Sequence, residues 1–188
     1  MEFSKVITGR RSVRNFTEKK PDREVVEKIL DLALYAPNAG NRQQTRVVVC
    51  NDKAVNGRFG KIHSALINNF NREGRLSYTD EEYEKSPNAF YNAPTVLYLL
   101  KPKNFYFSES DAYILADSIC LAAFDAGLSS CIVGEVGDAF DCAYGADVLK
   151  EWGIPDGYKA FAYVLLGYNA GEYPKPRERK YAPPVWVG

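Results

Sequence analysis

Residues 109–127, ESDAYILADSICLAAFDAG, form the most informative segment of the sequence. Apolar side chains fall almost all round the helix that this stretch predicts. We therefore expect a buried helix, placed either in the core of the domain or against a second copy of the chain. Ser110 or Asp111 is expected to cap its start, and Gly127 is expected to end it. The residues that follow, SSCIV at 129–133, predict a strand.

Further elements follow from hydrophobic patterning on both sides of this helix. Strands are predicted from apolar runs: VVVC at 47–50 and TVLYLL at 95–100, both expected to be buried, and KAFAYVLLGY at 159–168, long enough to be central. Helices are predicted at 22–36 with Asp22 as cap, at 54–70 with Asp52 as cap, and after Asp147. Residues 71–92 predict a loop with short helical pieces, and the proline-rich C-terminus predicts an extended tail.

Composition bounds the function. The 188 residues suit one domain, so we expect 1–188 to be a single unit. Its 24 Lys and Arg balance 24 Asp and Glu, so no overall field attracts nucleic acid or an anionic membrane. The first residues, MEFSKVITGR, lack the apolar run of a signal peptide, and no window approaches a membrane span. We expect a cytoplasmic protein with no nucleic-acid or membrane partner, whose anion site, if any, is local.

Cysteine and histidine usage disfavours metal and thiol chemistry. Cys50, Cys120, Cys131 and Cys142 are widely spaced, without a C-x-x-C pair, so we expect buried thiols and no metal site. His63 is the single histidine, which excludes His-based triads. We expect it on the surface or half-buried on a helix, because no carboxylate at a telling spacing orients it; the alternative is a lone acid or base.

A basic stretch, GRRSVRNF, lies near the N-terminus. In an extended chain alternate side chains point to opposite faces, so Arg10, Ser12 and Arg14 share one face. Arg11 and Val13 share the other. Each step of two residues spans roughly 6 to 7 Å, which favours an elongated phosphate-bearing ligand over a point anion. The alternative is a set of solvated arginines, or ion pairs with acidic residues of the next helix.

Four motifs occur in order: RRSVRNF at 10–16, ILDLALYAPNAGNRQQ at 29–44, LAAFDAGLSSCIVG at 121–134 and KPRERK at 175–180. With them the chain resembles the nitroreductase family of FMN-dependent NAD(P)H oxidoreductases over nearly its whole length. The resemblance implies an α+β fold with a central, mostly antiparallel sheet flanked by helices. It also implies a homodimer with FMN sites at the interface and a C-terminal tail that reaches the partner subunit.

The resemblance assigns the basic segments to FMN. The residues expected to hold its phosphate and ribityl end are Arg10, Arg11 and Ser12, completed by Lys175 and Arg177. Arg179 is kept as an alternative register. Arg14 is expected at the flavin N1 and C2 oxygen, where a fixed cation stabilises the negative charge of the reduced ring.

Two further segments are matched to the flavin ring. The loop expected to reach the partner's flavin contributes Pro37, Asn38, Ala39, Gly40, Asn41 and Gln43. Relatives often continue with Pro and Trp, whereas Gln44 and Thr45 stand here, which leaves the local wall and the substrate selectivity open. The strand end contributes Gly134 and Glu135, candidates for a backbone N–H to flavin N5, and Ile132 and Val133, expected to line the ring. The alternative for this segment is a plain core strand and turn.

The implied reaction is a ping-pong cycle. NADH or NADPH passes a hydride to flavin N5 and leaves, and a nitroaromatic, quinone or similar electron-poor acceptor is then reduced. Aromatic residues that either roof a flat substrate or belong to core and dimer packing are Tyr78, Tyr83, Phe90, Tyr91, Tyr106 and Phe107. The alternative functions are a non-catalytic flavin carrier or sensor and, more remotely, RNA-binding basic arms.

Overall fold

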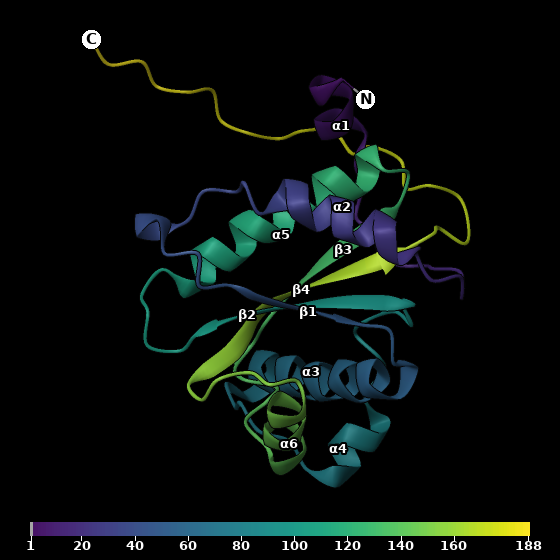
Figure 1. Ribbon diagram of the computed structural model, residues 1–188, viewed down its shortest axis with the longest axis vertical. Coiled ribbons are helices and arrows are strands. Elements are labelled where there is room, and N and C mark those ends of the chain that lie inside the picture. The colour runs from purple at the N-terminus through teal and green to yellow at the C-terminus, as the bar shows by residue number, and fades with distance from the viewer. Residues whose placement is uncertain (1) are drawn as a thin grey trace.

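A computed structural model describes residues 2–188 as a four-stranded antiparallel sheet between two layers of helices (Figure 1). The helices are α1 (Phe3–Gly9), α2 (Arg23–Ala33), the short 3-10 helix η1 (Ala39–Asn41), α3 (Lys53–Glu73), α4 (Asp80–Lys85), α5 (Ser108–Asp125) and α6 (Ala143–Glu151). The strands are β1 (Arg46–Cys50), β2 (Thr95–Pro102), β3 (Ser129–Gly134) and β4 (Tyr158–Gly167). The predicted α+β class and antiparallel sheet are confirmed.

The strand order is β1-β2-β4-β3, and every neighbouring pair is antiparallel. β2 and β4 are the two inner strands, as their long apolar runs require. β1 was expected to be buried but lies at the edge of the sheet, where Val49 is exposed. Val47 packs with the cluster on the α5 side and Val48 with the cluster on the α3 side, but both stay only partly buried at this edge. β3 forms the opposite edge and carries the segment matched to the flavin.

Helices cover both faces of the sheet (Figure 1). On one face, α2 and α5 pack on β2 and β4 through apolar side chains that include Ile29, Leu97, Ile119 and Val164. On the other face, α3 and α6 close an aromatic core around Tyr98 and Tyr163. Much of the apolar surface of α5 is explained by this position, since it packs against the sheet and against α2, although Ile114 stays exposed.

Several helix boundaries differ from the prediction. α1 was missed, because it has only seven residues and buries only Val6 among those described. α5 begins after Phe107, so neither Ser110 nor Asp111 is its N-cap residue. The Asp111 side chain makes tertiary contacts instead. α6 begins four residues before Asp147, with the Cys142 sulfur accepting a hydrogen bond from its first turn. Gly127 ends the α5 segment with φ of 79°, as expected.

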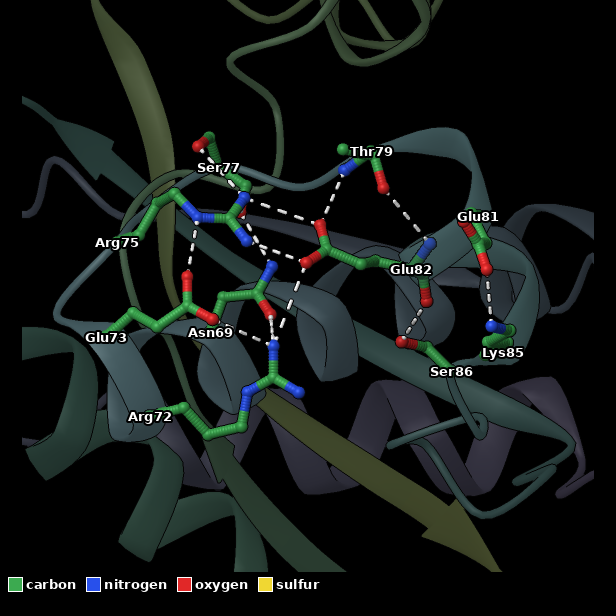
Figure 2. Close-up of polar contacts among 10 residues, drawn as sticks. All are labelled: Asn69, Arg72, Glu73, Arg75, Ser77, Thr79, Glu81, Glu82, Lys85 and Ser86. Carbon is green, nitrogen blue, oxygen red and sulfur yellow. Dashed lines mark hydrogen bonds and ion pairs between the residues drawn. The ribbon is translucent and has the colours of Figure 1, made fainter.

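A polar cluster fastens the link between α3 and α4 (Figure 2). Arg75 Nη2 lies 2.6 Å from Glu82 Oε1, and the backbone N–H of Thr79 donates to Glu82 Oε2 at 2.8 Å. The hydroxyl of Thr79 in turn accepts from the backbone of Glu82, which completes a capping box. These donors lower the pKa of Glu82 to about 2, chiefly through the Arg75 hydrogen bond. The cluster explains how a polar segment without apolar periodicity is held in place.

The first part of the C-terminal segment is hydrogen-bonded to the rest of the domain, and the remainder extends away from it. The backbone N–H of Ala170 donates to Asn15 O at 3.0 Å, and that of Arg11 donates to the Tyr173 hydroxyl at 2.9 Å. Beyond this point the chain runs out past α1 without regular structure, as its prolines predict (Figure 1). Among residues 2–188, no helix is long and apolar enough to cross a bilayer.

Candidate functional site

The basic stretch is held in an extended conformation beside β3. α1 ends at Gly9, where an added Cβ would lie 2.8 Å from the ring of Phe124, so the helix can approach α5 this closely only with glycine. Ser12 then pairs with Ser130 in a parallel bridge, and the N–H of Val13 donates to Ser130 O at 2.9 Å. The buried Val13 side chain anchors the arm in the core. The arginines on either side of it are thereby placed along the start of β3.

The basic stretch and the C-terminal segment together line one cavity of about 480 Å³. Its lining residues are Arg10, Arg11, Ser12, Arg14, Pro174, Lys175, Arg177 and Arg179. All the residues predicted for the phosphate end lie in this one group, although 161 residues separate Arg14 from Lys175 in the numbering. Arg179, the alternative register, lies there too, so the structure does not favour Arg177 over it.

The expected division into two faces is wrong in part. Val13 does point away from the solvent, but Arg10 and Arg11 line the same cavity. The reason is local: Arg10 is the C-cap residue of α1, and the long Arg11 side chain folds back so that Nη1 donates to Thr8 O and Arg10 O, both at 2.7 Å. Strand alternation fixes the direction in which a side chain leaves the backbone. A long arginine side chain can nevertheless fold back toward the same cavity.

This cavity has unused hydrogen-bonding capacity. Within residues 2–188, the buried Nε atoms of Arg10 and Arg11, which line the cavity, have no hydrogen-bond partner, and neither has the buried hydroxyl of Ser130 on the adjoining strand. Lys175 has an ion pair with Glu172 at 3.2 Å, but both side chains are exposed, so this pair neutralises the cavity only weakly. Buried donors are normally satisfied, and charged donors favour an anion such as a phosphate. The residues of the cavity therefore fit a phosphate group.

The loop after α2 has a distinct backbone. Gly40, Asn41 and Gln43 all have positive φ, at 62°, 48° and 50°. The loop is closed by its own polar groups: the N–H of Gln43 donates to Asn38 Oδ1, and the Gln43 amide donates to Asn41 Oδ1, both at 3.0 Å. Left-handed residues other than glycine are uncommon and are held here by these contacts. The loop is thus a rigid projection at the surface.

A buried ion pair fastens this loop to α5. The N–H of Ala39 donates to Asp111 Oδ1 at 2.9 Å, and Asp111 Oδ2 lies 2.5 Å from Lys101 Nζ. A second cavity of about 270 Å³ adjoins the pair and is lined by Leu34, Ala36, Pro37, Asn38, Gln43, Thr45, Asp111 and Leu115. Of the loop residues predicted to contact the cofactor, Pro37, Asn38 and Gln43 line this cavity, whereas Ala39, Gly40 and Asn41 lie outside it.

The two parts of the predicted site are far apart within one chain. The loop is attached at Asp111, near the start of α5, and the basic stretch packs on Phe124, near its end. Along the axis of α5 these residues are about 20 Å apart. Figure 1 shows the loop and α1 at opposite ends of this helical layer. A ligand confined to the basic cavity therefore does not reach the loop of the same chain, whereas an elongated ligand that runs along β3 to Gly134 comes close to Tyr113, two residues from Asp111.

The basic stretch, which lines the cavity, pairs with β3 at Ser130, and β3 continues from there to Gly134. Ser130 and Gly134 are separated by about 13 Å of extended chain, so an elongated ligand can run from one to the other. Ile132 packs with the cluster on the α5 side, and Val133 packs with the cluster on the α3 side. Their side chains point to opposite faces of the sheet, because neighbouring strand residues alternate, so each would meet a ring from a different side of this edge strand.

Glu135 contributes a buried carboxylate in addition to the backbone N–H that was predicted. Its carboxylate is turned into the core on the α3 side and is 3% exposed. There Oε1 lies 3.8 Å from His63 Nδ1, and Oε2 accepts a hydrogen bond from the Tyr163 hydroxyl. His63 is equally buried, so the expectation of a surface or half-buried histidine without a carboxylate is wrong. The partner was missed because it lies far away in sequence and is brought close only by the sheet.

The thiols behave largely as predicted. Cys50, Cys120 and Cys131 are buried, and burial raises the pKa of Cys120 to about 11. Cys142 is only half-buried, because its sulfur sits at the start of α6. The described part of the chain contains no cluster of side chains that could hold a metal ion. Among the aromatic candidates, Phe90 is a core residue, whereas Tyr106 is exposed.

Comparisons with known proteins agree with this geometry. The family model described as "Nitroreductase family" matches residues 7–168. The chain belongs to the nitroreductase family. A protein of Archaeoglobus fulgidus, described as an NADH dehydrogenase/NAD(P)H nitroreductase, is 40% identical to this family member over 176 residues, covering 91% of this chain and 87% of that protein.

Solved nitroreductase structures have the same fold as this nitroreductase-family chain. A nitroreductase of Bacteroides fragilis with bound FMN has a TM-score of 0.80 at 22% identity, with 100% of both chains covered. A nitroreductase of Desulfitobacterium hafniense with bound FMN has a TM-score of 0.69 at 25% identity, covering 97% of this chain and 98% of that one. The family predicted from the four motifs is thus confirmed.

Proposed function

We propose that this chain is an FMN-dependent oxidoreductase that acts as a homodimer, with residues 1–188 forming one FMN-binding domain. The observation that carries the proposal is the cavity beside β3, where buried arginine Nε donors without partners within residues 2–188 meet a second basic segment. Family membership and the FMN bound in the related structures support the choice of cofactor. The cytoplasmic location stays a prediction.

The phosphate end of FMN would be bound by the residues that share the basic cavity. These are Arg10, Arg11, Ser12, Lys175 and Arg177, with Arg179 as a further donor. Guanidinium groups match phosphate oxygens in pairs, and the Ser130 hydroxyl lies on the adjoining strand. The bound FMN would supply hydride transfer through N5, which no side chain of the protein can perform alone.

Arg14 and the end of β3 would act on the flavin ring. Arg14 lies at the exposed end of the basic stretch, and a cation there stabilises the negative charge that reduction places near N1. The backbone N–H of Gly134 or Glu135 is the proposed donor to N5. Ile132 or Val133 would contact the ring, but on opposite faces of the strand.

Dimerisation would supply the missing part of the site. Pro37 to Asn41 and Gln43 lie about 20 Å along α5 from the basic cavity of their own chain, and the resemblance to the family assigns them to the flavin of the partner subunit. Exposed apolar side chains on α1 and α5, namely Phe3, Ile7 and Ile114, suit a subunit interface. The extended C-terminal tail, with its exposed Trp186, is proposed to reach the partner as well.

The proposed reaction is a ping-pong cycle with small substrates. NADH or NADPH is the reductant, and a nitroaromatic, a quinone or a similar electron-poor compound is the acceptor. In this cycle the protein binds and orients the flavin and the substrates. The two substrates react in turn at one face of the flavin, and these steps require no nucleophile and no metal. No nucleic-acid or membrane partner is proposed.

Binding of FMN tests the proposal. The purified chain is titrated with FMN and, in parallel, with riboflavin, which lacks the phosphate, and flavin fluorescence is followed. We expect saturable binding of FMN and binding of riboflavin that is weaker by at least about tenfold, as for loss of a charged hydrogen-bonded group. Arg10→Ala should weaken FMN and leave riboflavin nearly unchanged. No binding of FMN by the folded wild-type chain would contradict the proposal.

A further inference from the structure

Three buried polar side chains meet behind the end of β3. Glu135 follows the last residue of β3, His63 lies on α3 and Tyr163 lies on β4. Glu135 and His63 are each 3% exposed, and Tyr163 is fully buried. The three lie on the α3 face of the sheet, within the aromatic core formed with Phe90 and Tyr98. This is an unusual place for a carboxylate, because buried acidic side chains are rare unless they are paired.

The contacts converge on the carboxylate of Glu135. The Tyr163 hydroxyl donates to Oε2, and the backbone N–H of Val136 donates to Oε1 at 3.1 Å. His63 Nδ1 lies 3.8 Å from Oε1 and has no hydrogen-bond partner within residues 2–188. The Val136 contact fixes the backbone conformation. Through it the carboxylate of Glu135 holds the N–H of the next residue in its own chain. The orientation of the peptides at 134–136 is thus coupled to a buried side chain.

Other charged groups surround the cluster. Burial raises the pKa of Glu135, and Asp138, three residues further along the chain, adds to this, whereas His63 and Lys159 on β4 lower it. Lys159 Nζ donates to Gly137 O at 2.8 Å, and Asp138 is paired with Lys103 at 2.7 Å. On the opposite face of the sheet the Tyr113 hydroxyl of α5 lies against Gly134, where an added Cβ would collide with it. The turn after β3 is therefore held from both faces.

We propose that Glu135, Tyr163 and His63 are positioning residues that fix the peptides at 134–136, and that Glu135 thereby sets the strength of the N–H contact to flavin N5. This inference rests on the proposed function, which places N5 at these peptides. The Glu135 carboxylate accepts the N–H of Val136, and the same carboxylate is fixed in the core by the Tyr163 hydroxyl, so the buried side chain holds the turn. A plain core strand would need no carboxylate here, since an apolar side chain would fill the space without a desolvation cost.

The contact to N5 affects the two redox states of FMN unequally. Oxidised N5 accepts a hydrogen bond, whereas reduced N5 carries its own hydrogen. A loosened turn therefore weakens the binding of oxidised FMN more than that of reduced FMN, and it raises the midpoint potential of the bound cofactor. A role confined to stability would weaken both states alike.

Two tyrosines of the same core provide a matched test. Tyr163→Phe removes the hydroxyl that donates to Glu135, and Tyr98→Phe removes a hydroxyl that donates to Asn56 Oδ1 at 2.9 Å. Both side chains are fully buried, and their ring centroids are 5.3 Å apart. Each variant keeps the ring and loses one buried hydrogen bond, so similar losses of stability are expected. Glu135→Ala removes all contacts of the cluster and serves as the stronger variant.

Three quantities are measured for these variants. Hydrogen exchange of the Gly134, Glu135 and Val136 amides is followed in the flavin-free chain, and the dissociation constant and midpoint potential are measured for FMN. For Tyr163→Phe we expect faster exchange at these amides, about fivefold weaker binding of oxidised FMN, as for loss of one hydrogen bond, and a raised potential. Tyr98→Phe should leave all three unchanged, and Glu135→Ala should exceed Tyr163→Phe.

Equal behaviour of Tyr163→Phe and Tyr98→Phe in all three measurements would overturn the inference. A wild-type chain that does not bind FMN would overturn the proposed function instead. In that case faster amide exchange in Tyr163→Phe alone would still support the clamping of the turn, while the link to N5 would be rejected. The two failures are therefore distinguishable.

Discussion

Asp111 holds the backbone of Ala39 at 2.9 Å and so joins the loop after α2 to the start of α5. The same carboxylate lies 2.5 Å from Lys101 Nζ, and the Lys101 side chain is fully buried. The charged Asp111 in the largely apolar α5 is therefore explained by its contacts with Ala39 and Lys101, which lie outside the helix. The loop proposed to reach the partner's flavin takes its position from this pair.

Loss of charge at Asp111 should destabilise the fold strongly. Asp111→Asn leaves the Lys101 ammonium buried without a counter-charge, for which we expect about 3–5 kcal/mol less free energy of unfolding in urea. The control is Glu81→Gln, which breaks an ion pair with Lys85 of the same 2.5 Å length between exposed side chains. Little measurable change is expected there. Equal effects of the two substitutions would show that burial does not decide the outcome.

The Arg75–Glu82 cluster should stabilise the fold at neutral pH and lose this effect in acid (Figure 2). The pKa of Glu82 is lowered to about 2, so its contribution is present above the ordinary value of 4.5 and is lost as the pH falls toward 2. Glu82→Gln should therefore flatten the decline of unfolding free energy over this interval, as followed by urea unfolding at a series of pH values. Glu84→Gln, which removes an exposed carboxylate of the same helix, is the control and should keep the wild-type decline.

Subunits with different defects should complement each other if the flavin site is shared. One chain carries Arg10→Ala and Arg11→Ala in the basic cavity, and the other carries Asn41→Asp and Gln43→Glu in the loop. Neither homodimer is expected to bind FMN well. Random reassortment would restore about a quarter of the sites, because half the dimers are hybrids and each hybrid has one intact site.

FMN binding by the reassorted mixture is measured against the two separate proteins. Mixing two preparations that both carry the cavity change is the control and should restore nothing. If the mixture of different variants also restores nothing while it does form hybrid dimers, the loop does not serve the partner's site.

Arg14 should affect the redox state of FMN more than its binding. Arg14→Ala removes a cation that stabilises the negative charge of the reduced ring, so binding of reduced FMN should weaken at least about tenfold more than binding of oxidised FMN. The midpoint potential, measured by redox titration, should fall accordingly. Arg10→Ala is the comparison and should weaken both states alike. Equal effects of Arg14→Ala on the two states would contradict the assigned role.

Elements defined by local pattern could be predicted from the sequence. β2 and β4 are continuous apolar runs, which a central strand requires, and Asp52 caps α3 with hydrogen bonds to the N–H groups of Ala54 and Val55, as expected. α1 could not be predicted in this way, since a seven-residue helix with one buried side chain is held mainly by its contact with Phe124.

Site residues could be predicted where a motif contains them. The basic stretch and KPRERK meet in one cavity, as the resemblance implied. The partners that hold the site could not be found from spacing: Glu135 meets His63 and Tyr163 only because β3, β4 and α3 are stacked. One signal was available, since strand alternation places Glu135 on the same face as Cys131 and Val133, which face the core.

Anaerobic reduction of the FMN-loaded chain tests the central claim most directly. The protein is mixed with NADH or NADPH in the absence of oxygen, and the flavin absorbance bands are followed; a quinone or nitroaromatic is added afterwards. We expect NADH or NADPH to bleach the flavin bands and the acceptor to restore them. Flavin that stays bound and oxidised with both reductants would contradict an oxidoreductase and would indicate a flavin carrier or sensor.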